Sequence, residues 1–116
     1  MARIKRAYGT YVYEIRDGML KDFYGGYKYK LDGNYIREYY GRILYEICGN
    51  KIKRYCGSYV FEIDGDRIKK AYGSYIYEIR DNKIKEFYGR YLYEIEGSLS
   101  YNELMMLIAV LFGDAY

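Results

Sequence analysis

The chain has 116 residues, enough for one domain that encloses a modest core. It contains 20 tyrosines but no histidine, tryptophan or proline, and the missing histidine removes the usual acid/base group of enzymes and the commonest metal ligand. The 19 basic and 16 acidic residues are spread along the whole chain and leave a net charge of +3, which argues against a basic tail or patch for nucleic acid.

Residues 3–98 consist of a 16-residue unit that is repeated six times without insertion or deletion. The units start at Arg3, Met19, Tyr35, Lys51, Arg67 and Lys83. Each unit ends in a turn such as Asp64-Gly65-Asp66. A strict period of this kind marks a supersecondary element that cannot bury its apolar face alone and therefore packs against its neighbours.

Each unit is predicted to form two short strands. Residues 59–63, with the sequence Tyr-Val-Phe-Glu-Ile, are rich in β-branched and aromatic residues and alternate their side chains as a strand does. Residues 67–72 form the other half of the same pattern. Glycines recur near every eighth position and mark the turns, so six units predict twelve strands.

Charge favours an antiparallel meander over a stacked solenoid. A solenoid would stack the basic residues of successive units in one like-charged ladder, which is destabilising at strand spacing. A meander with two-residue turns at Gly73-Ser74 and Asp64-Gly65 pairs opposite charges instead. The expected cross-strand pairs are Lys69 with Glu78, Ala71 with Ile76, Ile68 with Ile79, Glu62 with Arg67 and Phe61 with Ile68. Lys30 is an exception, because it would face Lys21.

The same register sorts the side chains by face. The face expected to be buried holds Ile68, Tyr72, Tyr75, Tyr77 and Ile79. The opposite face holds Lys69, Ala71, Ile76 and Glu78. A β-bulge near Ala71 would instead turn that position inward, and the equivalent residues of the other units are apolar enough to allow this.

Residues 99–113 leave the repeat and are predicted to form a capped hydrophobic helix. Ser100 and Glu103 match a capping box. Leu99 can staple onto Leu104, and Gly113 is placed for a C-cap. Apolar residues surround the helix axis, which favours a core helix over a membrane-inserting or partner-binding one. The residues expected to be enclosed by strands of all six repeats are Leu104, Leu107, Ile108 and Leu111.

These elements predict a single, mainly β domain over residues 1–116: a 12-strand antiparallel meander closed into a barrel around the C-terminal helix. Twelve strands ~4.8 Å apart and tilted by roughly 40° close into a cylinder about 11 to 12 Å in radius, which holds a helix and one layer of side chains. The alternative is an open single-layer sheet with the helix packed on one face. Its remaining apolar face would need a second copy, so this alternative is a dimer.

Twelve antiparallel strands followed by a hydrophobic helix resemble the tubby-like barrel, shared by tubby, phospholipid scramblases and LURP-one-related proteins. The similar phrases are Tyr-Val-Tyr-Glu-Ile at 11–15, Tyr-Leu-Tyr-Glu-Ile at 91–95 and Leu-Met-Met-Leu-Ile-Ala-Val-Leu-Phe at 104–112. The resemblance implies a closed barrel around a central helix. It covers the order of the elements, and no family motif assigns a functional residue in this chain.

No catalytic, cofactor or metal site is predicted. Cys48 and Cys56 lie at opposite ends of one predicted strand, too far apart for a disulfide, so both are expected to be free thiols. Neither has a histidine to activate it as a nucleophile. The turn Asp64-Gly65-Asp66 is more simply a hairpin turn than a calcium loop, which needs 6 to 8 oxygen ligands.

A regular series of basic residues is the candidate binding site. It consists of Lys5, Lys21, Arg37, Lys53, Lys69 and Lys85, one from each unit. Such a ring can meet anionic lipid headgroups, although partner glutamates would neutralise much of its charge. The tyrosines can stack bases, but at alternate strand positions they are more simply core residues.

The leading hypothesis is a non-enzymatic structural or protein-interaction module, because the short turns leave no loop in which a catalytic pocket could develop. The alternative is a peripheral binder of anionic lipid headgroups through the basic ring. We expect a protein partner or self-association, and neither nucleic acid nor a small-molecule substrate. The chain enters its first repeat without a signal peptide, and its longest apolar run, residues 104–112, is short of a bilayer span, so we expect a cytoplasmic protein.

Overall fold

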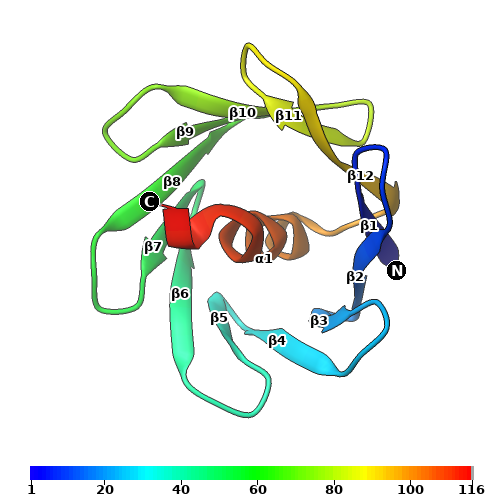
Figure 1. The fold of residues 1–116 in the computed structure, drawn as a ribbon. Helices are drawn as coiled ribbons and strands as arrows, with labels where there is room; N and C mark the ends of the chain where they lie inside the picture. Colours follow the sequence, from blue (N-terminus) through cyan, green and yellow to red (C-terminus); the bar gives the residue numbers. More distant parts are fainter. Residues whose placement is uncertain (116) are drawn as a thin grey trace.

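The structure, a computed structural model, describes residues 1–115. In this range the chain forms twelve antiparallel strands, one α-helix and a short 3-10 helix (Figure 1). The strands are β1 Ala2–Arg6, β2 Tyr11–Arg16, β3 Met19–Asp22, β4 Tyr27–Asp32, β5 Tyr35–Glu38, β6 Ile43–Cys48, β7 Lys51–Arg54, β8 Tyr59–Asp64, β9 Arg67–Lys70, β10 Tyr75–Arg80, β11 Lys83–Glu86 and β12 Tyr91–Gly97. The helices are α1 Tyr101–Phe112 and η1 Gly113–Ala115.

The sheet closes on itself between its first and last strands. β1 pairs with β12, and Ile4 lies opposite Ile95 at the centre of this seam. Every strand therefore has two hydrogen-bonded neighbours, and no edge is exposed. The predicted closed barrel is confirmed, and the open-sheet alternative is wrong.

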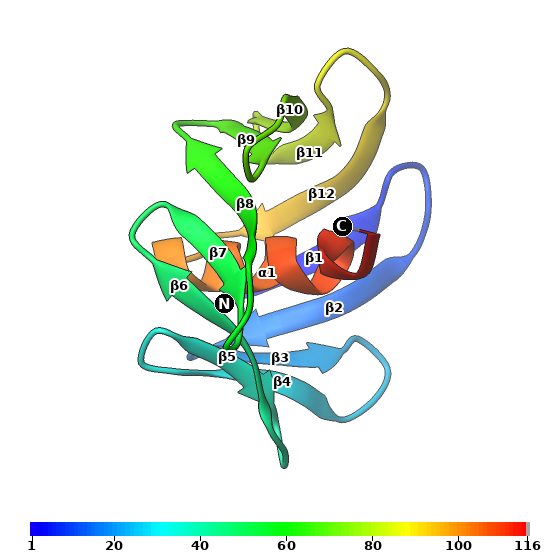
Figure 2. The ribbon, with the colours of Figure 1, turned by 90° about the vertical axis from the view of Figure 1, so that its left-hand side faces the viewer.

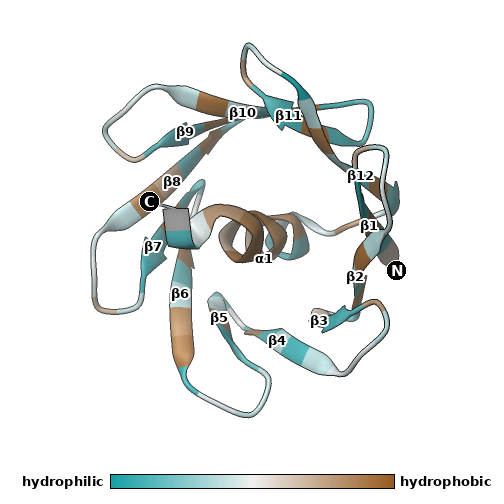
Figure 3. Cartoon of the chain, in the orientation of Figure 1, coloured by the Kyte–Doolittle hydropathy of each residue, from teal (hydrophilic) through white to brown (hydrophobic). Residues whose placement is uncertain are grey.

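Helix α1 runs through the barrel along its axis (Figure 2). The helix is hydrophobic along most of its length, as its brown colour shows in Figure 3. The helix residues buried in the core are Met105, Met106, Leu107, Ile108, Ala109 and Phe112. Each repeat adds one fully buried residue opposite the helix: Ile4, Leu20, Ile36, Ile52, Ile68 and Ile84. The predicted core helix is thus confirmed.

The helix begins at the predicted capping box. The Ser100 hydroxyl accepts a hydrogen bond from the Glu103 N–H at 3.2 Å, and the Ser100 N–H donates to Glu103 Oε1 at 2.9 Å. Gly113 is the predicted C-cap, but its backbone is right-handed, with φ −60°. A Cβ there would collide with the Tyr45 hydroxyl, so the position needs a glycine for space.

The predicted strand register is wrong. The short turn is Gly65-Asp66, one residue later than expected, so Ile63 pairs with Ile68 and Glu62 with Lys69. The next connection is not a two-residue turn but a four-residue turn at 71–74. Across it Glu78 pairs with Arg67 instead of Lys69. The pairing of opposite charges survives this shift because the basic residue of each unit except Arg37 meets a glutamate on one of its two neighbouring strands.

A β-bulge at the second residue of the longer strand also changes the faces. In β10 the register slips between Tyr75 and Tyr77, which turns Ile76 toward the core and Tyr75 outward. The bulge was expected near Ala71, in the previous connection. Tyr77 lies inside as predicted, but Tyr72 is 88% exposed in its turn. The same slip occurs after each of the six four-residue turns.

Candidate functional site

The predicted basic ring lies on the outer wall of the barrel. Lys5, Lys53, Lys69 and Lys85 each lie within 4.0 Å of a glutamate carboxylate on a neighbouring strand. These lysine side chains are only 26% to 30% exposed. Lys21 faces Glu14 across β2 and β3. The ring is therefore regular, as expected, but glutamates on the neighbouring strands neutralise most of its positive charge.

The second repeat carries a lysine, Lys30, in place of the glutamate, and neighbouring residues compensate its charge. Lys30 stands where the other repeats carry a glutamate, and it pairs with Arg37 across β4 and β5 instead of with Lys21. Arg37 turns away to Asp32, 3.1 Å away, and to the Gly41 carbonyl oxygen at 2.7 Å. The Lys30 ammonium lies 5.2 Å from the centre of the Tyr39 ring, a cation–π contact. Each cation of this like-charged pair thus has another partner.

The two ends of the barrel differ. At one end lie the two-residue turns and the start of the helix, because the Gly18 N–H donates a hydrogen bond to Glu103 Oε2 at 2.9 Å. At the other end lie the six four-residue turns and the end of the helix, where Arg54 Nη2 donates to the Gly113 carbonyl oxygen at 3.1 Å. In Figure 1 these six turns spread outward around the barrel opening.

The tips of the four-residue turns carry exposed tyrosines, which we call the tyrosine crown: Tyr8, Tyr24, Tyr40, Tyr72 and Tyr88. Their side chains are between 86% and 96% exposed. Cys56 holds the equivalent position of the remaining turn and is an exposed free thiol. Five large aromatic side chains thus reach into solvent at one end of the molecule.

Two crown residues have an unusual backbone. Tyr8 has φ +57° and Tyr72 has φ +61°, in the left-handed region that favours glycine. A bulky residue in this region costs on the order of 1 to 3 kcal/mol. Folding alone would be better served by glycine at both positions.

Three crown tyrosines belong to fixed clusters of rings. On the outer wall Tyr11 stacks on Phe23 with ring centroids 4.7 Å apart, and Tyr24 meets the Phe23 ring edge-on at 4.8 Å. The same arrangement recurs with Tyr40 on Tyr39 and with Tyr88 on Phe87. These crown residues are held in place by aromatic contacts and by the hydrogen bonds of their turns.

Two repeats have alanine, Ala7 and Ala71, where three others have the stacked ring. At Ala7 the space becomes an open groove of about 660 Å³, bordered by Tyr8, Tyr91, Arg6 and Arg90. This groove crosses the seam between β12 and β1. The crown thus combines three tyrosines held in ring clusters with a groove beside Tyr8.

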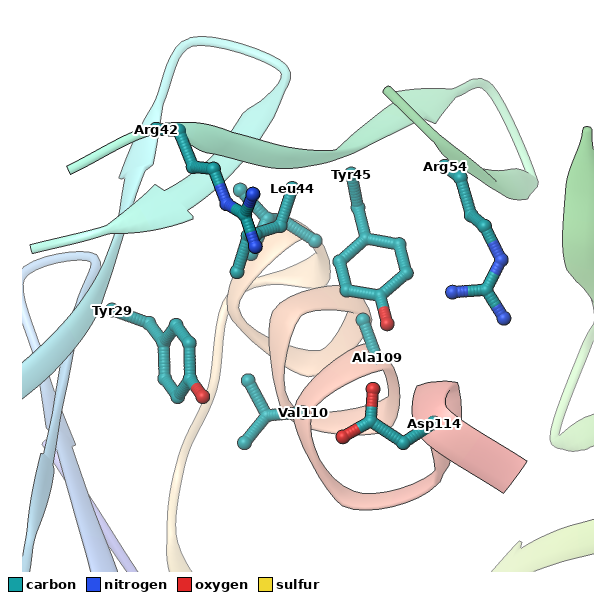
Figure 4. A pocket seen from close by; sticks show the side chains of 9 residues that line it. Tyr29, Arg42, Leu44, Tyr45, Arg54, Ala109, Val110 and Asp114 are labelled. Atoms are coloured by element: carbon teal, nitrogen blue, oxygen red, sulfur yellow. The ribbon is translucent and has the colours of Figure 1, made fainter. Parts of the chain in front are cut away.

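A more enclosed pocket lies beside the end of the helix (Figure 4). Its volume is about 230 Å³. The lining residues are Tyr29, Ile36, Arg42, Leu44, Tyr45, Arg54, Ala109, Val110 and Asp114. Aliphatic side chains from the wall and the helix form its apolar part, and two guanidinium groups, two phenol hydroxyls and one carboxylate supply its polar groups.

The pocket exists because side chains fill the space between the helix and the barrel wall on one side of the helix but not on the other. On one side the Phe112 ring stacks on Tyr77 and meets Tyr93 edge-on, so that part of the lumen is full. On the other side the helix presents only the small residues Ala109 and Val110. The β4 wall also lacks an apolar residue at the bulge, because Lys28 stands there and its ammonium lies 3.4 Å from Asp22.

The shifted pKa values follow from burial and hydrogen bonds. Burial raises the pKa of the Tyr45 phenol, and the nearby Arg54 guanidinium opposes this effect. The hydrogen bond to Asp64 raises the pKa of Tyr75 on the outer wall. Burial alone would raise the pKa of Glu103, but hydrogen bonds from the Ser100 and Gly18 N–H groups hold it below its ordinary value.

Other predicted sites have ordinary structural surroundings. Cys48 and Cys56 are free thiols, as expected. Asp64 accepts a hydrogen bond from the Tyr75 hydroxyl at 2.6 Å, next to its hairpin turn. Within residues 1–115 no cluster of three acidic or cysteine side chains is placed to hold a metal ion. None of the helices in the described part of the chain has the length and hydrophobicity to cross a bilayer.

Comparisons with protein-family models, with curated proteins and with solved structures find no match to this chain.

Sequence reasoning identified the basic ring but missed both the crown and the pocket. The signal for the crown is the dipeptide Tyr-Gly, which recurs at 8–9, 24–25, 40–41, 72–73 and 88–89. Glycine in this dipeptide marks a turn, so the tyrosine before it belongs to the turn and not to the buried face. The pocket has no comparable signal, because its residues come from four strands, one turn and the two helices.

Proposed function

We propose that this chain is a non-enzymatic structural or protein-interaction module, and that the tyrosine crown is the surface that meets a protein partner. The observation that carries this proposal is Tyr72, which is 88% exposed and has φ +61°. Its ring makes no stacked or edge-on contact with another ring of residues 1–115, although it borders a small hollow beside Tyr59 and Phe61, so aromatic stacking does not explain its presence. Strained residues that folding does not require are retained chiefly at functional sites.

The composition of the crown suits protein recognition. Tyrosine supplies a large, rigid and amphipathic contact at a low cost in conformational entropy, and tyrosine and arginine are enriched among the residues that dominate interfaces. Arg42 and Arg90 lie in the same turns as Tyr40 and Tyr88. Each arginine is held by a glutamate two residues before its turn's tyrosine, at 3.2 Å and 3.4 Å.

The partner that fits the crown is a folded protein with a broad surface. The molecule measures 37 × 32 × 22 Å, and the turns spread around the barrel opening (Figure 1). A face of this width can bury the roughly 800 Å² per partner of a standard interface. The grooves beside Tyr8 and Tyr24 and the exposed rings of the crown provide the relief that a complementary protein surface needs.

The lipid alternative has weaker support. Four of the six ring cations lie beside glutamates, and a neutralised ring attracts anionic headgroups only weakly. The crown, by contrast, does not coincide with the ring: it lies at one end of the barrel, and the ring lies on the side wall.

The test compares two variants of the full chain that disable these two surfaces. In the crown variant the five exposed tyrosines, Tyr8, Tyr24, Tyr40, Tyr72 and Tyr88, become serine. In the ring variant the five lysines, Lys5, Lys21, Lys53, Lys69 and Lys85, become glutamine. Each immobilised protein is used to capture partners from a cell extract, and a captured protein is then purified and its Kd measured.

We expect the purified partner to bind the parent chain and the ring variant, and to lose at least tenfold in affinity for the crown variant. Equal binding of the partner to parent and crown variant would contradict the proposal. The same proteins are floated with phosphatidylserine liposomes at low and high salt. Salt-sensitive flotation of the parent that the ring variant loses would favour the lipid alternative.

A further inference from the structure

We propose that the pocket beside the end of α1 binds a free α-amino acid with an apolar side chain, such as leucine or phenylalanine. This inference does not rest on the proposed function, because the pocket and the crown tyrosines are different residues.

The size of the pocket sets the size of the ligand. A cavity of about 150 Å³ is known to hold a benzene molecule, so the 230 Å³ here has room for one ring or branched chain and a few more atoms. Drug-sized molecules usually occupy pockets of roughly 300 to 1,000 Å³. The apolar part is formed by Ile36, Leu44 and Val110, which suits an aliphatic or aromatic side chain.

Two arginines supply the recognition of a carboxylate. Arg54 uses one terminal nitrogen to bind the Gly113 carbonyl oxygen at 3.1 Å. Arg42 uses its Nε for Glu38, 3.2 Å away, and its side chain is 82% exposed. Each guanidinium keeps further N–H groups for a ligand, and an arginine–carboxylate contact is among the strongest hydrogen-bonded pairs.

Asp114 supplies the recognition of an ammonium group. Its carboxylate is exposed at the opening and makes no hydrogen bond or ion pair with another residue of the described range 1–115. It stands just after the last turn of α1, where the partial negative charge of the helix end also favours a cation. Figure 4 shows the Asp114 carboxylate and the Tyr45 hydroxyl among the side chains that line the pocket.

This mixture of charges excludes simpler ligands. A fatty acid or a phosphate would meet the Asp114 carboxylate at the pocket and would bring no cationic group to balance it, so Asp114 would repel it. An amine without a carboxylate would leave the arginines without a partner. A zwitterion satisfies both sets of groups, and its side chain occupies the apolar part.

Isothermal titration calorimetry with the full chain tests the ligand class. The probes are L-leucine and L-phenylalanine, with 4-methylpentanoate as the analogue lacking the ammonium group and 3-methylbutylamine as the analogue lacking the carboxylate. We expect L-leucine or L-phenylalanine to bind at least about tenfold more tightly than either analogue, since each analogue loses one charged contact. If neither amino acid binds at millimolar concentrations, or if an analogue binds as well, the proposal is wrong.

Arg42→Gln and Arg90→Gln form a matched pair that locates the site. Both arginines hold a glutamate in an i,i+4 ion pair and are equally exposed, but only Arg42 lines the pocket. We expect Arg42→Gln to weaken amino-acid binding about tenfold and Arg90→Gln to leave it unchanged. Equal effects of the two changes would overturn the assignment.

Asp114→Asn distinguishes recognition of the ammonium group of the ligand from recognition of its carboxylate. This change should weaken L-leucine about tenfold while improving or preserving 4-methylpentanoate, because it removes only the ammonium partner. If it weakened both probes equally, Asp114 would not be the ammonium partner and the proposal would fail. The urea midpoint of each variant is measured in parallel, so that a loss of folding is not taken for a loss of binding.

Discussion

The ring of Phe112, the last residue of α1, lies flat against the ring of Tyr77 on β10, with centroids 3.9 Å apart and planes inclined by 19°. This contact anchors the end of the helix to one side of the barrel. It also fixes which side stays partly empty, since the pocket opens on the opposite wall.

Replacing Phe112 by alanine should cost about 3 to 5 kcal/mol of unfolding free energy, because a buried ring and its stacking partner are lost together. Urea unfolding followed by circular dichroism measures this. Phe23→Ala is the matched control: its ring also stacks on a tyrosine, but on the outer wall. We expect about 1 kcal/mol there, and similar losses at both positions would contradict the central role of the helix end.

Leu107 and Ile108 are fully buried between the helix and the barrel wall. Leu107→Ala or Ile108→Ala should each cost about 2 to 5 kcal/mol through lost burial and a cavity. Truncation after Ser98 should leave a barrel with an empty apolar lumen, which collapses or aggregates. A shift below roughly 0.5 kcal/mol in urea melts, the size of a surface change, would mean that the helix is not the core.

Glu103 ties the start of the helix to the turn between β2 and β3. Because its pKa is lowered on folding, its stabilising contribution is present at neutral pH and is lost as the pH falls through the pKa of the folded state. Glu103→Gln should therefore be less stable than the parent by about 1 kcal/mol at pH 7. Melts between pH 7 and pH 3 should show this difference shrinking toward zero. A constant difference would contradict the assigned cause.

Substitutions of Tyr72 show whether its left-handed backbone lowers the stability of the fold. Glycine tolerates its left-handed backbone and alanine does not, so Tyr72→Gly should be more stable than Tyr72→Ala by about 1 kcal/mol. At Lys83, an exposed strand residue, the order should reverse, with alanine the more stable. The same order at both positions would show that the backbone of Tyr72 carries no strain.

The sequence predicted most of the fold because two features, the repeat and the C-terminal tail, each indicate the same structure in several independent ways. The repeat gives six independent views of one hairpin, and the tail carries the capping box of Ser100 and Glu103 together with an apolar surface on every side. A helix of this kind has to be enclosed, and a barrel of twelve strands is the size that encloses it.

The register could not be read in the same way. Alternation predicts which residues share a face only while the strand is regular, and the bulge at Ile76 turns Tyr75 outward, against the prediction. The prediction that Tyr72 is buried is wrong for another reason: the expected two-residue turn at Gly73-Ser74 is a four-residue turn at 71–74, which takes Tyr72 out of the strand. The pocket escaped prediction because it depends on how Val110 and Phe112 point once the helix is inserted, which no local pattern encodes.

The central helix also sets the copy number of the repeat. Nearly identical hairpins joined by equivalent turns have no intrinsic reason to close after the twelfth strand rather than the tenth or fourteenth. The barrel radius grows roughly in proportion to strand number, so deleting or adding one 16-residue unit changes it by about 2 Å. The smaller barrel would crush Met105 and Leu107, and the larger one would leave them without contacts. The size of the helix thus determines how many repeat units can close around it. The helix residues and the number of units must therefore change together when units are gained or lost.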